Sequence, residues 1–270
     1  MKKFWVTLGL CLGAGIVLAH EFWLQPSQYF AQAGNRISLK ILVGEGFLGE
    51  PSEGKKNRII QYRHYTANRI TDLSPTLSGD TYSDVSVVLT SPGTHLFSFS
   101  NTPKFLTMKA DSFLLYLKED GLDGVIAARQ QRGDSRKPSR ELYQRCVKTL
   151  VQVGQKTDRT FATNTNLPLD IRASRNPYDQ RAGQQGEFQV LFGQKPVANA
   201  LVRYWNRNAA NRLSEERQRS DRQGRVRFRL RSGQNMISVV HMVPASDTAQ
   251  ARYGRADWHS YWGSLTFGCR

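Results

Sequence analysis

The sequence predicts a mainly β protein with two β-sandwich domains joined by a short helical connector. Short runs in which apolar and polar residues alternate fill residues 20–118 and return over residues 167–270, with turn residues between the runs. Over residues 119–154 the apolar residues instead recur every three or four positions, as on one face of a helix. We therefore expect an N-terminal β-sandwich over 20–118, a helical connector and linker over 119–166, and a C-terminal β-sandwich over 167–270.

The strands of the N-terminal domain are predicted from strict alternation. Residues 37–43 alternate up to a pair of glycines, and residues 84–89 run into Ser91-Pro92-Gly93. Residues 95–100 then alternate again. These runs indicate an antiparallel sheet with turns at its corners.

The connector is predicted to contain two helices. Leu122, Val125 and Ile126 are spaced for one helical face. After Pro138, with Ser139 as a plausible cap, a second helix is expected from an apolar stripe. This stripe consists of Leu142, Tyr143, Cys146, Val147, Leu150 and Val151. The polar, unpatterned residues 154–166 are interpreted as a linker.

The C-terminal domain is predicted from six further alternating runs separated by turn sequences. Residues 193–196 and 220–224 have turn composition, and the second has Asp early and Gly late, as tight turns prefer. The predicted strands are 167–171, 187–192, 200–205, 225–230, 236–243 and 258–267.

The first nineteen residues have the three parts of a cleavable signal peptide. Lys2 and Lys3 form the basic start, residues 6–18 the apolar run, and Val17 and Ala19 the small residues before a cleavage site. Cleavage would make His20 the first residue of a mature periplasmic protein. No later segment approaches the roughly 20 apolar residues of a transmembrane helix, so we do not expect an integral membrane protein.

The net charge and the cysteines give little information about the binding partner. The formal charge of +16 becomes about +14 without Lys2 and Lys3, and nucleic acid is an unsuitable partner for an exported protein. Most arginines of the second half alternate with apolar or acidic residues, which is typical of solvated strand faces. Cys146 and Cys269 remain after cleavage, and the sequence leaves open whether they form a disulfide.

Known catalytic motifs are absent from the sequence. It has no Gly-x-Ser-x-Gly elbow, no phosphate-binding glycine loop, no Cys-x-x-Cys and no His-Glu-x-x-His. We therefore predict that the protein is not an enzyme.

The new N-terminus is the strongest candidate for a binding site. A free α-amino group on His20, beside its own imidazole, can chelate a transition-metal ion in one ring, and nitrogen donors suit Ni²⁺ or Cu²⁺. The apolar Phe22-Trp23-Leu24 behind it is expected to be tied into a sheet. His241, His259 and His95 are candidates for further nitrogens, although each is also compatible with a core histidine in a strand; His64 is expected at the surface.

Several ordered blocks resemble the DUF4198 family of exported bacterial proteins. The blocks cover nearly the whole mature chain, and they are residues 19–26, 113–121, 142–154, 168–183, 193–196, 240–242 and 257–267. The resemblance implies a tandem of β domains, the second similar to transthyretin-like or carboxypeptidase-regulatory modules. We expect both sandwiches to be of the Ig-like or transthyretin-like kind. It also implies a role as a periplasmic component of nickel or cobalt uptake, with His20 and His241 matching the family's His start and His-Met block. His259 stands where an acidic residue is expected in relatives.

These observations predict a periplasmic protein that binds nickel or cobalt, or copper, through His20, His241, His259 and His95. Such a protein would support metal uptake or delivery by handing the ion to a membrane metal transporter. The alternative is a noncatalytic envelope scaffold or adhesion module whose basic faces hold a protein or glycan partner, with binding that weakens steeply with salt.

Overall fold

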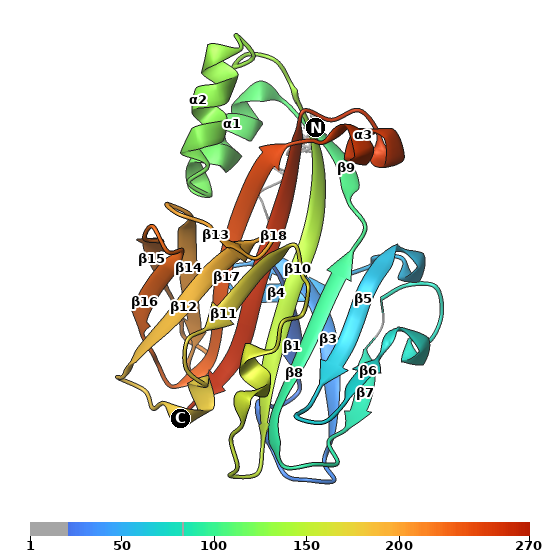
Figure 1. Cartoon of the computed structure of the whole chain (residues 1–270), viewed down its shortest axis with the longest axis vertical. Helices are drawn as coiled ribbons and strands as arrows, with labels where there is room; N and C mark the ends of the chain where they lie inside the picture. Colours follow the sequence, from blue (N-terminus) through green and yellow to red (C-terminus); the bar gives the residue numbers. More distant parts are fainter. Residues whose placement is uncertain (1–20, 83) are drawn as a thin grey trace, which may run out of the picture.

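The computed structural model describes residues 21–82 and 84–270, so the predicted signal peptide, its cleavage site and His20 lie outside the described residues. The described chain is mainly β, as predicted, and its strands lie in three sheets (Figure 1).

The central sheet has ten strands and contains segments from both ends of the chain. Its strand order is β15-β14-β17-β18-β10-β8-β5-β6, and β2 and β9 also pair with β10 (Figure 1). In sheet order these strands are β15 (Leu213–Arg219), β14 (Leu201–Arg207), β17 (Gly233–Pro244), β18 (Trp258–Cys269), β10 (Ser139–Val153), β8 (Gly93–Asn101), β5 (Ile59–Tyr65) and β6 (Ile70–Asp72), with β2 (Phe30–Ala31) and β9 (Lys104–Met108).

Two smaller sheets cover opposite faces of the central sheet. On β10, Cys146 and Leu150 point into a core shared with β11, β12 and β16, whereas Val147 and Val151 point into a core shared with β1, β3 and β7. Successive strand residues face opposite sides, so the two cores lie on the two faces of β10. One small sheet comprises β1 (Glu21–Pro26), β3 (Arg36–Glu45), β4 (Leu48–Pro51) and β7 (Val85–Val88); the other comprises β11 (Leu169–Ala173), β12 (Gln185–Phe192), β13 (Lys195–Pro196) and β16 (Arg225–Arg229).

The three described α-helices occupy one end of the molecule (Figure 1). α1 (Ala110–Glu119) and α2 (Asp123–Gln131) pack apolar side chains such as Phe113 against Val240, Met242 and Trp262 of β17 and β18. None of the described helices has the length and apolarity needed to cross a membrane. The remaining helices are α3 (Asp247–Tyr253) and the 3₁₀ turns η1 (Lys56–Arg58), η2 (Ser74–Thr76), η3 (Arg159–Ala162) and η4 (Pro177–Asp179).

The predicted second helix of the connector is wrong. α2 forms where Leu122, Val125 and Ile126 predicted a helix, but residues 139–153 form β10, the fifteen-residue strand at the centre of the ten-stranded sheet. Ser139 is therefore no helix cap but the first residue of a strand. β10 pairs in parallel with β18 and antiparallel with β8 and β9, so strands from both predicted sandwich domains share one sheet.

The apolar stripe of β10 lacks alternation because both of its faces are covered. Every residue from Cys146 to Val153 is buried, and the buried polar ones have partners. The ammonium group of Lys148 contacts the buried carboxylate of Asp170 on β11, and Thr149 Oγ1 donates a hydrogen bond to the carbonyl of Thr266 at 3.3 Å. A strand buried on both faces has no polar side to reveal its period of two.

The two cysteines are free and distant from each other. Cys146 lies opposite Gly263 in the parallel β10–β18 pair, and Cys269 is six residues further along β18. At about 3.3 Å per residue this separation is about 20 Å, far beyond the reach of a disulfide.

We therefore expect Cys146 and Cys269 to remain thiols even after oxidation in air. Burial raises the pKa of Cys146 to about 12, so its thiol should react with a thiol reagent only after unfolding. Intact-mass measurement after alkylation in denaturant checks this: for protein that begins at His20, and so lacks Cys11, two added alkyl groups are expected, and none would contradict the structure.

Candidate functional site

The described chain begins in the core rather than at the surface. Glu21 is only 6% exposed, and β1 pairs along its whole length with β3. Two hydroxyls of β18 tie β1 to the central sheet: Ser264 Oγ donates to the carbonyl of Phe22 and Thr266 Oγ1 to that of Leu24, both at 2.8 Å. The expectation that the apolar residues behind His20 are tied into a sheet is confirmed.

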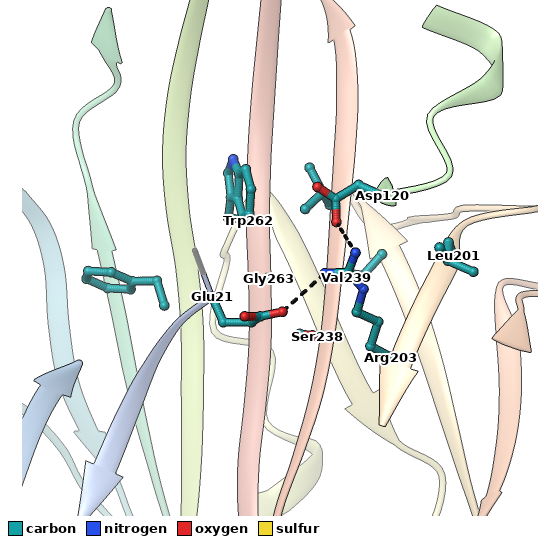
Figure 2. Close-up of a pocket in the computed structure, with 10 residues that line it drawn as sticks. Glu21, Asp120, Leu201, Arg203, Ser238, Val239, Trp262 and Gly263 are labelled. Atoms are coloured by element: carbon teal, nitrogen blue, oxygen red, sulfur yellow. Dashed lines mark hydrogen bonds and ion pairs between the residues drawn. The ribbon is translucent and has the colours of Figure 1, made fainter. Parts of the chain in front are cut away.

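Arg203 holds Glu21 to the turn after α1 (Figure 2). Its guanidinium lies 3.1 Å from Glu21 Oε1 and 3.0 Å from Asp120 Oδ1, and it donates to the carbonyl of Glu119 at 2.9 Å. All three charged side chains are buried. Burial raises the pKa of Asp120 to about 7 although Arg203 opposes the shift, and Asp120 Oδ2 has no hydrogen-bond partner among the described residues. Glu21, Asp120 and Arg203 form what we call the anchor cluster.

A second buried carboxyl lies beneath α1. Glu141 Oε1 accepts hydrogen bonds from Tyr116 of α1, at 3.2 Å, and from Ser260 of β18. Trp262 Nε1 in turn donates to Ser260 Oγ at 3.0 Å. Burial raises the pKa of Glu141 to about 7, and its Oε2 has no partner among the described residues.

The anchor cluster opens into a groove. A cavity of about 10 Å³, room for no more than a single water, lies beside Glu21 and Arg203. Three of its lining residues, Asp120, Leu201 and Val240, also line a larger groove of about 410 Å³ that includes His241. The groove follows β17 beyond Val239, the last residue of β17 that pairs with β14.

His241 and His259 lie on the same face of the central sheet. His241 is directly opposite Tyr261 in the β17–β18 pair, and His259 precedes Tyr261 by two residues, so the two histidines are diagonal neighbours. The ring of Tyr261 lies 4.2 Å from that of His259, and Phe192 covers both Tyr261 and His241, with ring centroids at 4.8 and 4.6 Å.

The ring of His259 is only partly satisfied. Its Nδ1 lies 3.1 Å from the hydroxyl of Tyr261, whereas its Nε2 is buried and has no partner among the described residues. Burial lowers the pKa of His259 to about 4 and also lowers that of His241, so both rings are neutral near pH 7. Neutral imidazole is the form that ligates metal ions.

His95 lies elsewhere. It pairs across β8–β10 with Val151, whose side chain faces the β1 side of the central sheet, opposite to the face that carries His241 and His259. Both of its ring nitrogens are engaged, Nδ1 with His64 at 2.8 Å and Nε2 with the carbonyl of Ser91 at 2.9 Å. His64 itself is 9% exposed, so its predicted surface position is wrong.

The described residues contain no group of three or more His, Cys, Asp or Glu side chains placed to hold a metal ion. The structure thus brings together two of the four predicted ligands, His241 and His259, and leaves His20 outside the described residues. The sequence interpretation missed Glu21, Asp120, Arg203 and Glu141. Of these four residues, only Glu21 could have been singled out from the sequence, because it directly follows the predicted N-terminal residue His20.

Several arginines on the basic strand faces of the second half form ion pairs with local acids. Arg203 is buried in the anchor cluster, and the others with ion pairs lie at the surface. These surface pairs are Arg217–Glu215, Arg219–Asp123, Arg225–Glu187, Arg227–Glu187 and Arg231–Glu216. Exposed pairs of this kind contribute little stability, and they agree with the interpretation as solvated strand faces.

Comparison with known proteins gives a family but no activity. No protein with a curated description matches the chain significantly. Among solved structures, the three N-terminal domains of the bacteriophage RB49 Highly Immunogenic Outer Capsid protein (Hoc) align with 93% of this chain and 71% of their own, at 5% identity and a TM-score of 0.21. The family described as "Domain of unknown function (DUF4198)" matches residues 17–243. The chain therefore belongs to the DUF4198 family.

Proposed function

We propose that the protein is a periplasmic transition-metal-binding protein that supports the uptake or delivery of nickel or cobalt, or of copper. In this proposal the amino group and imidazole of His20 bind the ion, His241 supplies a further nitrogen, and His259 lies behind it as a third. The protein would pass the ion to a membrane metal transporter and carry out no catalysis.

One observation carries the proposal. Glu21, the residue after His20, lies in a cavity whose lining residues Asp120, Leu201 and Val240 also line the groove of His241. A terminus at His20 would thus begin one peptide bond from a fixed residue that lines the cavity adjoining this groove. The anchor cluster would hold that terminus in place without itself ligating the ion.

The donors suit a transition metal. Nitrogen ligands favour Ni²⁺, Co²⁺ and Cu²⁺ over hard cations such as Mg²⁺. The buried Nε2 of His259 has no hydrogen-bond partner among the described residues. A metal ion or a water would supply one. His95 is the weakest of the four predicted ligands, because its two ring nitrogens are already engaged.

We further propose that each small sheet and the part of the central sheet that it covers correspond to one sandwich of the Ig-like or transthyretin-like kind. The two separate cores on the opposite faces of β10 support this division.

Calorimetric titration with Ni²⁺, Co²⁺ and Cu²⁺ tests the metal site. Mature protein beginning at His20 is expected to bind one equivalent. A variant with one extra glycine ahead of His20 should bind at least about tenfold more weakly, because the amine moves out of the chelate ring. His241→Gln should also weaken binding, and a glycine added after Arg270 is the matched control that should leave it unchanged.

Equal binding by mature protein and the N-terminally extended variant would reject the terminal site. Absence of metal binding, together with retention of a protein or glycan partner that high salt releases, would support the scaffold or adhesion module instead.

A further inference from the structure

A second polar cleft lies away from the proposed metal site. It has a volume of about 520 Å³ and opens between the turn that joins β5 to β6 and the turn that joins β7 to β8. His64 and His95 lie in its wall, on the face of the central sheet opposite to His241. Side chains with hydroxyl groups also line the cleft, namely Thr66, Thr71, Ser86, Thr90 and Ser91.

The hydrogen bonds of the histidine pair fix which ring nitrogen has no partner among the described residues. The carbonyl of Ser91 can only accept, so His95 Nε2, at 2.9 Å from it, carries the proton. In the neutral ring His95 Nδ1 is then an acceptor, and His64 Nε2, at 2.8 Å, must donate to it. His64 Nδ1 is left with a lone pair and no partner among the described residues. Phe97, stacked on His64 at 4.3 Å and 9°, holds the ring in this orientation.

Two cations without an ion-pair partner among the described residues line the cleft. Arg69 and Lys156 line it, both are exposed, and neither forms an ion pair with another described residue. The acidic side chain that lines the cleft, Asp158, is already engaged: its Oδ2 accepts from the backbone of Thr94 at 3.1 Å and its Oδ1 from that of Thr160 at 2.8 Å. A ligand therefore meets two cations, one uncharged acceptor and a carboxylate whose two oxygens already accept backbone hydrogen bonds.

We propose that this cleft binds a hydroxylated carboxylate, such as a sugar acid or a small hydroxy acid. Arg69 and Lys156 would receive the carboxylate, and a hydroxyl of the ligand would donate to His64 Nδ1. The rim hydroxyls would complete the contacts with the remaining hydroxyls of the ligand. The cleft is large enough for one sugar ring, because ligand pockets typically start at about 300 Å³.

Other ligand classes satisfy the cleft less well. A metal ion would find one free ring nitrogen, a carboxylate whose oxygens already accept backbone hydrogen bonds, and two neighbouring cations that repel it. A simple anion without a donor would leave His64 Nδ1 unpaired. An uncharged sugar would leave Arg69 and Lys156 without a counter-charge.

Titration followed by NMR or calorimetry separates these classes. D-Glucuronate and L-malate represent the sugar acids and the small hydroxy acids, and at least one is expected to bind with a dissociation constant in the millimolar range or tighter. Glucose, which lacks the carboxylate, and acetate, which lacks the hydroxyl, should each bind at least about tenfold more weakly. Equal binding of all four compounds, or of none, would overturn the proposal.

Variants then locate the site. Arg69→Gln and Lys156→Gln alter exposed side chains, so both should fold and should weaken binding of the preferred compound by about tenfold. Lys104→Gln, at an exposed position on β9, is the matched control that should bind as the native protein does. Native affinity in both Arg69→Gln and Lys156→Gln would overturn the assignment to this cleft.

Discussion

Replacing Arg203 with Met is expected to lower the free energy of unfolding at pH 8 by about 3–5 kcal/mol. The change leaves the carboxylates of Glu21 and Asp120 buried without their cation, and a buried charge that loses its partner is strongly destabilising. It also removes the hydrogen bond to the carbonyl of Glu119 at the end of α1. Denaturant unfolding of both proteins measures the loss.

Arg217→Met is the matched control. Arg217 forms a 2.5 Å ion pair with Glu215, but its side chain is 42% exposed, and an exposed pair contributes less than about 1 kcal/mol. A loss for Arg203→Met no larger than that of this control would mean that the anchor cluster does not hold the start of β1. Adding Asp120→Asn to Arg203→Met should recover part of the loss, because one of the two unpaired charges disappears.

Glu141→Gln should gain stability over the native protein as the pH rises. The pKa of Glu141 is raised from 4.5 to about 7 in the folded protein. Between these two values the folded state keeps a proton that the unfolded state has lost, so this group makes the native protein less stable as the pH increases. Glutamine is neutral throughout, so the difference between variant and native protein should grow by about 2–3 kcal/mol from pH 5 to pH 8.

The comparison with native protein is needed because other groups act in the opposite direction. Burial lowers the pKa of His64 to about 3 and that of His259 to about 4, so both destabilise the fold as the pH falls below about 6.5. Their contribution cancels in the difference. Glu187→Gln is the control, since ion pairing lowers the pKa of Glu187 and no gain from pH 5 to pH 8 is expected. A flat profile for Glu141→Gln would show that this carboxyl is not desolvated.

The strands with one polar face could be predicted from the sequence. The runs 187–192 and 225–230 alternate because one side of β12 and of β16 faces solvent, and they match these strands to within two residues. The prediction for residues 139–153 was wrong because both sides of β10 are buried. Its buried polar residues contact partners that are distant in sequence: Lys148 contacts Asp170, and Thr149 donates a hydrogen bond to the carbonyl of Thr266. The periodicity of apolar residues along the strand cannot reveal such contacts.

The candidate site was predictable only in part. His241 and His259 fall in alternating runs, so a shared sheet face was open to prediction, but their proximity depends on the pairing of β17 with β18. The anchor cluster required the fold, because Glu21 and Arg203 are 182 residues apart in the chain. Arg203 also resembled its surface-exposed neighbours Arg217 and Arg219 in the sequence, and only burial distinguishes it from them.

The anchor cluster suggests how a β protein without a described metal cluster could still serve as a metal carrier. Its buried charges fix the chain at Glu21, next to the groove of His241. A chelate at the terminus would add its remaining donors from His20 itself. Such a site forms only when the residues ahead of His20 are removed, so metal binding would be restricted to the exported protein.

Elemental analysis of protein purified from the periplasm with its native terminus tests this account most directly. N-terminal sequencing should begin at His20, and the same sample should contain about one equivalent of nickel, cobalt or copper. A protein that begins at His20 and contains none of these metals, and that binds none when they are supplied, would contradict it.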